Sequence, residues 1–136
     1  MTASGILDLK ALLTGLEPKL LSEKYVFCIG TEGQAHRLSP IATFREVEGL
    51  TLVLTKAQAD EAGLAYEATF RCITLTVHSS LEAVGLTAAV STALAEQGIS
   101  ANVIAAYYHD HVFVPSERAE EAVNVLRSLS TSPSPS

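Results

Sequence analysis

The fold is decided by the second half of the chain, RCITLTVHSSLEAVGLTAAVSTALAEQGISANVIAAYYHDHVFVPSERAEEAVNVL, from Arg71 to Leu126. The order of signals in it predicts a strand, a helix, a strand, a tight turn, a strand and a helix. The first strand is indicated by Ile73, Leu75 and Val77, which alternate with polar residues. This period of two is typical of a sheet with one buried face.

The first helix of this stretch is predicted from its two ends and its apolar face. Ser79 and Glu82 have the spacing of a capping box, in which two side chains bind free backbone amides at a helix start. Gly98 predicts the helix end, because glycine adopts the left-handed conformation without a Cβ clash, and Ile99 can then fold back onto the helix. The predicted buried face consists of Leu86, Val90, Ala93 and Leu94.

A hairpin and a second helix follow. Strands are predicted from Asn102 to Tyr108 and from His111 to Val114, and only His109-Asp110 separates them, which is the length of a hairpin turn. Ser116 is the predicted cap of the second helix. The buried face of that helix is predicted to hold Ala119, Ala122, Val123 and Leu126.

The first half of the chain gives a less regular pattern. Strands are predicted at Tyr25–Ile29, Ile41–Val47 and Leu50–Leu54, with a polar loop at Gly30–Leu38 and a turn at Glu48-Gly49. Thr55 and Gln58 form a second capping-box pattern, and Gly63 predicts the end of that helix. A strand that begins at Tyr66 is expected to run on into Ile73.

Two segments resemble a known family, namely HSSLEAVGLTAAVSTALAEQGIS (His78–Ser100) and AAYYHDHVFVPSERAEEAVNVL (Ala105–Leu126). They are similar to the ACT domain, a ligand-binding module that regulates amino-acid metabolism. The branch that looks most similar is found in the lysine-responsive aspartokinases and the animal cytosolic arginine sensor. In that branch an Asp-His pair begins the strand that ends in Val-Pro, as Asp110-His111 and Val114-Pro115 do here. The resemblance implies an α+β, ferredoxin-like βαββαβ sandwich.

An internal repeat predicts that the chain holds two such units. The pattern of Thr43 to Ala62 recurs at Ile104 to Val123, with Gly49 opposite Asp110 and Thr55 opposite Ser116. We therefore expect tandem ACT-like units with antiparallel sheets that share a strand near residues 66 to 77. The expected divisions are a degenerate N-terminal unit at 1–65, a C-terminal ACT domain at 66–129 and a disordered Ser/Pro-rich tail at 130–136.

Composition excludes several classes of protein. The 136 residues are 48% hydrophobic and 18% charged, which suits one small domain or two very small ones. The net charge of −6 disfavours a nucleic-acid partner. No run reaches the roughly 18–20 apolar residues of a membrane span, and the start MTASGILDLK lacks the layout of a signal peptide, so we expect a cytoplasmic protein. Cys28 and Cys72 are expected to be buried free thiols, with a disulfide or metal role as the alternative.

Candidate catalytic and metal patterns are weak, so we expect no enzyme and no cofactor. Ser79 and Ser80 lack the GxSxG context of a serine hydrolase, and no phosphate-binding glycine motif occurs. The His109-Asp110-His111 run supplies two or three ligands, where a closed zinc site needs about four. The remaining enzyme alternative is a small acylphosphatase-like hydrolase that would use Arg71 and Asn102, although the glycine-rich loop expected around the arginine is missing.

A non-catalytic ligand site is better supported. A helix N-terminus attracts a carboxylate, and the Asp110 carboxylate can pair with an ammonium or guanidinium group, so an α-amino acid carries both charges needed. By resemblance, Asp110 matches the acid that grips the ligand side chain and Ser79–Leu86 the loop that binds the ligand backbone. Turn chemistry alone also explains Asp110, and packing alone explains Gly85. The predicted ligand-binding residues are Ser79, Ser80, Leu81, Glu82, Val84, Gly85, Leu86, Asp110 and His111.

These patterns predict a small regulatory sensor that binds an amino acid at an ACT–ACT interface. We expect a homodimer, since exposed strand edges favour pairing, and a separate protein as the regulated target. The alternative is a module that only dimerises or docks a partner and binds no ligand.

Overall fold

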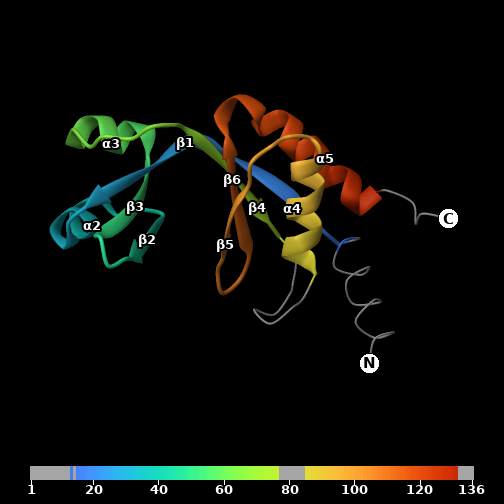
Figure 1. Ribbon diagram of the computed structural model, residues 1–136, viewed down its shortest axis with the longest axis horizontal. Helices are drawn as coiled ribbons and strands as arrows, with labels where there is room; N and C mark the ends of the chain where they lie inside the picture. The colour runs from blue at the N-terminus through green and yellow to red at the C-terminus, as the bar shows by residue number, and fades with distance from the viewer. Residues whose placement is uncertain (1–12, 14, 77–84, 132–136) are drawn as a thin grey trace. The chain divides into compact units, whose positions relative to one another are not determined.

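The computed structural model describes residues 13, 15–76 and 85–131 (Figure 1). The chain forms two compact units. Unit 2 is Ser22–Arg71, and unit 1 combines the chain up to Leu21 with the chain from Cys72 onward. Unit 1 is therefore discontinuous in sequence, and unit 2 is inserted into it.

The described elements have the α+β, ferredoxin-like arrangement that the sequence predicts. In chain order they are β1 (Pro18–Gly30), α2 (Glu32–Leu38), β2 (Ala42–Arg45), β3 (Leu50–Thr55), α3 (Lys56–Ala62), β4 (Phe70–Leu75), α4 (Leu86–Glu96), β5 (Asn102–Ala105), β6 (Asp110–Pro115), the 3-10 turn η1 (Ser116–Arg118) and α5 (Ala119–Thr131). Hydrogen-bonded strand neighbours follow the order β2-β3-β1-β4-β6-β5. The strands β1 and β4 each cross from one unit to the other, at Leu21–Ser22 and at Arg71–Cys72.

Unit 2 packs two short helices onto one face of its sheet. β3 pairs antiparallel with β1 from Tyr25 to Gly30 and with β2 on its other side. The buried cluster consists of Val26, Cys28, Leu50, Leu52, Leu54 and Ala59. The predicted strand Tyr25–Ile29 is confirmed as part of the longer β1, but its last residue is not buried, since Ile29 is 64% exposed.

The prediction of a loop at Gly30–Leu38 is wrong, because this segment contains helix α2. A capping box starts the helix: the Gln34 amide donates to Thr31 Oγ1 (3.1 Å) and the Thr31 amide donates to Gln34 Oε1 (2.9 Å). The predicted capping box of Thr55 and Gln58 is confirmed at α3, as is the end of α3 at Gly63, which has φ of 70°. The local hydrogen bonds therefore decide both helix starts in this unit.

Unit 1 packs α4 and α5 into one larger core. The apolar faces predicted from spacing are confirmed at seven of their eight residues: Leu86, Val90 and Leu94 of α4 are buried, as are the α5 residues Ala119, Ala122, Val123 and Leu126. The remaining residue of the predicted α4 face, Ala93, is only partly buried. The predicted end of α4 is confirmed too. Gly98 has φ of 71°, its amide donates to the Ala95 carbonyl (2.9 Å), and the Ile99 amide donates to the Leu94 carbonyl (3.0 Å). These two bonds are those of a Schellman motif.

The helix starts predicted for unit 1 differ from those in the structure. Helix α4 begins at Leu86 with Gly85 as its N-cap, and the predicted capping box of Ser79 and Glu82 lies outside the described residues. Ser116 does not cap the second helix: the chain enters a 3-10 turn after Pro115, and no side-chain cap is found there among the described residues. The Ser116 hydroxyl is buried and has no hydrogen-bond partner in the described part of the chain.

The hairpin turns lie earlier than the sequence suggests. In the β5–β6 hairpin Ala105 pairs with Asp110, and the Ala106 amide donates to the His109 carbonyl (3.1 Å), so Tyr107 and Tyr108 form the turn. The predicted turn at His109-Asp110 is therefore wrong. In the β2–β3 hairpin Glu46 and Gly49 exchange two backbone bonds (3.0 and 3.2 Å), which places the turn at Val47-Glu48.

With these turns placed, the internal repeat has an offset of 60 residues instead of the predicted 61. β2 corresponds to β5, β3 to β6 and the start of α3 to the start of η1. Thr55 is therefore equivalent to Pro115 and not to Ser116. The predicted strand start at Tyr66 is also wrong, since β4 begins at Phe70.

Candidate functional site

The predicted ligand-binding residues divide into three groups in the structure. Ser79, Ser80, Leu81, Glu82 and Val84 lie outside the described residues. Gly85 and Leu86 form the start of α4. Asp110 and His111 are the first two residues of β6. All four described residues belong to unit 1.

The start of α4 has an open first turn. Gly85 has φ of 103°, a conformation that glycine adopts far more readily than other residues, and among the described residues no side chain caps the first amides. The uncapped amides carry the positive end of the helix dipole, which suits an anionic group. Leu86 is only 2% exposed and belongs to the core cluster, so it offers its backbone to a ligand and not its side chain.

The start of β6 lies beside the end of β4. His111 Nδ1 is 3.0 Å from the Oγ1 of Thr74, a buried residue of β4. Thr76, two residues later, is the last described residue before the predicted ligand loop. The start of α4 and the β5–β6 turn lie toward the same end of unit 1 (Figure 1). The structure thus brings Asp110 and His111 to the strand end from which the predicted loop departs.

His111 is better suited to hold strands together than to exchange protons. The pKa of His111 is lowered, mainly by burial and to a smaller extent by the nearby His109. The Asp110 carboxylate opposes this shift. Lowering its pKa keeps the imidazole neutral at neutral pH. Its contact with Thr74 joins β6 to β4. Sequence reasoning did not identify Thr74, because it is one of the polar residues that alternate with the apolar face of this strand.

The described residues give little support for catalysis or metal binding at this end. No group of three or more His, Cys, Asp or Glu side chains among them could hold a metal ion. Burial raises the pKa of the Cys72 thiol to about 11, with an opposing hydrogen bond from Thr74, and burial also raises the pKa of Cys28. Both thiols are buried and free, and thiols with a raised pKa are poor nucleophiles.

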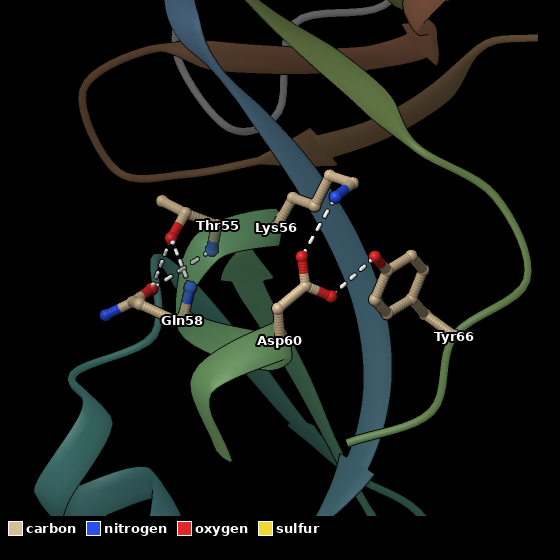
Figure 2. Close-up of polar contacts among 5 residues, drawn as sticks. All are labelled: Thr55, Lys56, Gln58, Asp60 and Tyr66. Atoms are coloured by element: carbon tan, nitrogen blue, oxygen red, sulfur yellow. Dashed lines mark hydrogen bonds and ion pairs between the residues drawn. The ribbon is translucent and has the colours of Figure 1, made fainter. Parts of the chain in front are cut away.

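In unit 2, side chains cap both helix starts, in contrast to the start of α4 in unit 1. At α3 the Gln58 amide donates to Thr55 Oγ1 (3.1 Å), and the Thr55 amide donates to Gln58 Oε1 (3.0 Å), as Figure 2 shows. Because both helices of unit 2 begin with capping boxes, their own side chains already occupy the positions that a ligand carboxylate would take.

A second polar cluster in Figure 2 fixes the outer side of α3. Lys56 Nζ donates to Asp60 Oδ2 (2.9 Å), and the Tyr66 hydroxyl donates to Asp60 Oδ1 (2.7 Å). Both bonds lower the pKa of Asp60, and the bond from Lys56 has the larger effect. The bond to Asp60 in turn raises the pKa of Tyr66. The cluster ties the segment after α3 back to the helix, so we interpret it as structural.

The two halves of the chain match family models separately. One ACT domain model matches residues 4–71, and another matches residues 67–128. The chain therefore belongs to the ACT domain family and carries two ACT domains in tandem. None of the curated proteins matches the chain significantly. No helix in the described residues has the length and apolar character to cross a membrane.

Three solved structures place the fold more closely. A Vibrio cholerae protein of unknown function, described as a possible transport protein, is 55% identical, with a TM-score of 0.84 over 93% of this chain and 98% of that one. An Agrobacterium tumefaciens protein is 16% identical, with a TM-score of 0.69 over 85% and 89% of the two chains. The ligand-free regulatory subunit of aspartate kinase from Thermus thermophilus is 15% identical, with a TM-score of 0.61 over 82% and 95%. The last two likenesses concern the fold alone.

Proposed function

We propose that this chain is an amino-acid-binding regulatory module that has no catalysis of its own and acts in the cytoplasm on a separate protein. The observation that carries the proposal is the open start of α4 at Gly85, in the same unit as Asp110. Membership of the ACT family and the likeness to an aspartate kinase regulatory subunit support a regulatory role.

The proposed binding mode uses both charges of an α-amino acid. The ligand carboxylate receives hydrogen bonds from the first amides of α4, and its ammonium or a basic side chain pairs with Asp110. In this proposal Ser79, Ser80, Leu81, Glu82 and Val84 bind the backbone of the ligand, and His111 fixes the start of β6 through Thr74. Unit 2 has no equivalent site because its helix starts are closed by Thr31 and Thr55.

The protein is proposed to act as a homodimer. β2 and β5 stand at the two ends of the strand order, so each has one edge without a hydrogen-bonded strand neighbour among the described residues. Unpaired strand edges are common sites of pairing between chains. Light scattering measures the mass directly, and a monomer at micromolar concentration would contradict this part of the proposal.

The test of ligand binding is a thermal-melt screen with the twenty amino acids. A ligand at about 100 times its dissociation constant stabilises the folded state by roughly 2.7 kcal/mol, which raises the melting temperature of a chain of this size by several degrees. We expect one or two amino acids to do so, and Asp110→Ala to abolish the rise. Glu48→Ala, which removes an exposed carboxylate from the hairpin of unit 2, is the matched control.

A second candidate function, partner docking without a ligand, is favoured by the apolar surface of unit 2. Ile29 and Phe44 are both opposite Thr51 in the strand register, so the three lie in one row across β1, β3 and β2. Ile29 is 64% and Phe44 69% exposed. A dimer that persists while no amino acid shifts the melt would favour this function over the sensor.

A further inference from the structure

Unit 1 contains a groove of about 540 Å³ that is separate from the start of α4. Its walls come from the beginning of β1, from Thr76 at the end of β4, and from one side of α5. A volume of this size is within the usual range for small-molecule sites. All the lining residues belong to unit 1 and to the described part of the chain.

Hydrogen bonds to one carbonyl fix the strand wall of the groove. The amide and the hydroxyl of Thr76 both donate to the Glu17 carbonyl, at 3.1 and 2.9 Å. This carbonyl therefore faces β4, and because successive residues of a strand present their backbone to opposite edges, Pro18 faces outward. Proline has no N–H, so the outward position exposes no unsatisfied donor. The strand that forms this wall of the groove is therefore fixed in place, and at Pro18 it offers no N–H group to another strand.

The groove is lined by apolar side chains at its base and by charged side chains of both signs around them. Val123 of α5 is 2% exposed and Leu20 is half-buried, and both line the groove. The charged residues that line it are Glu17, Lys19, Glu120 and Arg127. None of Glu17, Lys19 and Glu120 has an ion-pair partner among the described residues. Two carboxylates, an ammonium group and a guanidinium group therefore line one cavity.

This charge pattern selects a class of ligand. A simple anion in the groove would lie near Glu17 and Glu120, and a simple cation would lie near Lys19 and Arg127, so each would meet a like charge. A small zwitterion can place its ammonium toward the carboxylates and its carboxylate toward Lys19. The apolar base of Leu20 and Val123 can then cover an aliphatic side chain.

We propose that this groove is a second ligand site, which binds a small zwitterion of the α-amino-acid type independently of Gly85 and Asp110. The charges are exposed, and exposed ion pairs contribute little each, so the affinity is in the millimolar range. The site is shallow compared with a buried pocket, and it accepts several amino acids with aliphatic side chains.

The test uses isothermal titration calorimetry together with amide NMR shifts on the full chain. The probes are the twenty amino acids and, for each one that binds, its N-acetyl and amide derivatives, which lack one of the two charges. We expect shifts at Leu20, Thr76 and Val123, and at least tenfold weaker binding of both derivatives. The double variant Lys19→Gln/Glu120→Gln is expected to weaken groove binding at least tenfold, whereas Asp110→Ala and the control Glu96→Gln leave it unchanged.

The outcomes separate the groove from the site of the proposed function. Binding that Asp110→Ala abolishes and the double variant leaves intact would overturn the groove and support the α4 site. The reverse result would support the groove and overturn the α4 site. Two molecules per chain, each lost in its own variant, would support both. If none of the amino acids binds at about 10 mM, both the groove site and the α4 site are overturned.

Discussion

The two units begin their helices in opposite ways. Both helices of unit 2 start with a capping box, at Thr31 and at Thr55, and both are seven residues long. In unit 1, α4 has 11 residues and α5 has 13, and no side chain in the described part of the chain caps the start of α4 or of η1. Short helices are marginal alone, so they depend on local bonds, whereas long helices are stabilised mainly by packing. A helix held by packing can leave its first amides open to another molecule.

The cores of the two units agree with this comparison. Among the described residues, the buried cluster of unit 1 has thirteen members and that of unit 2 has six. The larger cluster stabilises α4 and α5 through their apolar faces without help from caps.

The largest expected effect comes from truncating core leucines. Leu94 in unit 1 and Leu52 in unit 2 are both fully buried. We expect Leu94→Ala and Leu52→Ala each to reduce the free energy of unfolding by about 2–5 kcal/mol. Because β1 and β4 belong to both units, each variant is expected to unfold in one transition. Urea denaturation followed by circular dichroism measures both quantities, and two separate transitions would show that the units are independent.

A smaller effect is expected at two glycines near the start of α2. A Cβ at Gly30 would lie 2.4 Å from Leu52 Cδ1 and 3.0 Å from Gln34 Oε1. Leu52 is fully buried, and Gln34 Oε1 accepts the hydrogen bond from the Thr31 amide, so a shift of either has a cost. We expect Gly30→Ala to cost about 1–3 kcal/mol.

The matched control is Gly33→Ala, in the helix itself. The nearest atom to a Cβ at Gly33 is Thr31 Oγ1 at 3.8 Å, which leaves room. Alanine favours helix over glycine by about 0.8–1.0 kcal/mol, so this variant should be neutral or stabilising. Thermal melts of the two variants compare them directly. Equal destabilisation would mean that the close packing of α2 against β3 is not the cause.

The contrast in capping can be tested with one hydroxyl from each unit. Thr55→Ala removes a side chain that caps α3 and should cost about 1 kcal/mol. Ser116→Ala removes a buried hydroxyl without a hydrogen-bond partner in the described residues, so we expect no loss and a small gain. Chemical denaturation measures both. A loss at Ser116 as large as that at Thr55 would contradict the assignment of an uncapped start in unit 1.

The smallest expected effect is a pH dependence at Asp60. Hydrogen bonds from Lys56 and then from Tyr66 lower its pKa from the ordinary value of 3.8. Its contribution to stability is therefore fully present above the pKa of the unfolded chain and is lost as the pH falls through the lower folded value. The effect is small because the group is exposed to solvent.

Asp60→Asn should remove this part of the acid destabilisation, and Tyr66→Phe should remove some of it. The free energy of unfolding, measured between neutral pH and about pH 2, provides the comparison. An unchanged acid profile in Asp60→Asn would mean that the carboxylate has no net preference for its folded surroundings.

The sequence predicted the apolar faces and the helix ends correctly, because these features depend on periodicity and on single glycines. The helix starts show what limits such predictions. The same spacing of threonine and glutamine occurs at Thr31–Gln34 and at Thr55–Gln58, but Gly33 made the first segment look like a loop. Ser79 and Glu82 have capping-box spacing, yet the N-cap of α4 is Gly85 and the helix begins at Leu86.

The hairpin turns were predicted one or two residues too late, because the residues that form them are unusual in turns. Tyr107 and Tyr108 favour strands, and the turn at these positions is closed by the backbone bond between Ala106 and His109. Asp110, which favours turns, is paired in β6 instead. For the candidate site, the sequence predicted Gly85 and Asp110, whereas the contact between Thr74 and His111 joins two strands that lie 37 residues apart in the chain and needed the structure.

The crossing of β1 and β4 has a consequence for how such a gene can change. The family models match the two halves 4–71 and 67–128 separately. However, β1 from the first half and β4 from the second half each have residues in both structural units. A recombination event that deleted either half would leave the remaining sheet without a neighbour for one long strand. Once the duplication had adopted this connection, the two copies could diverge in helix length and capping but could no longer be inherited separately.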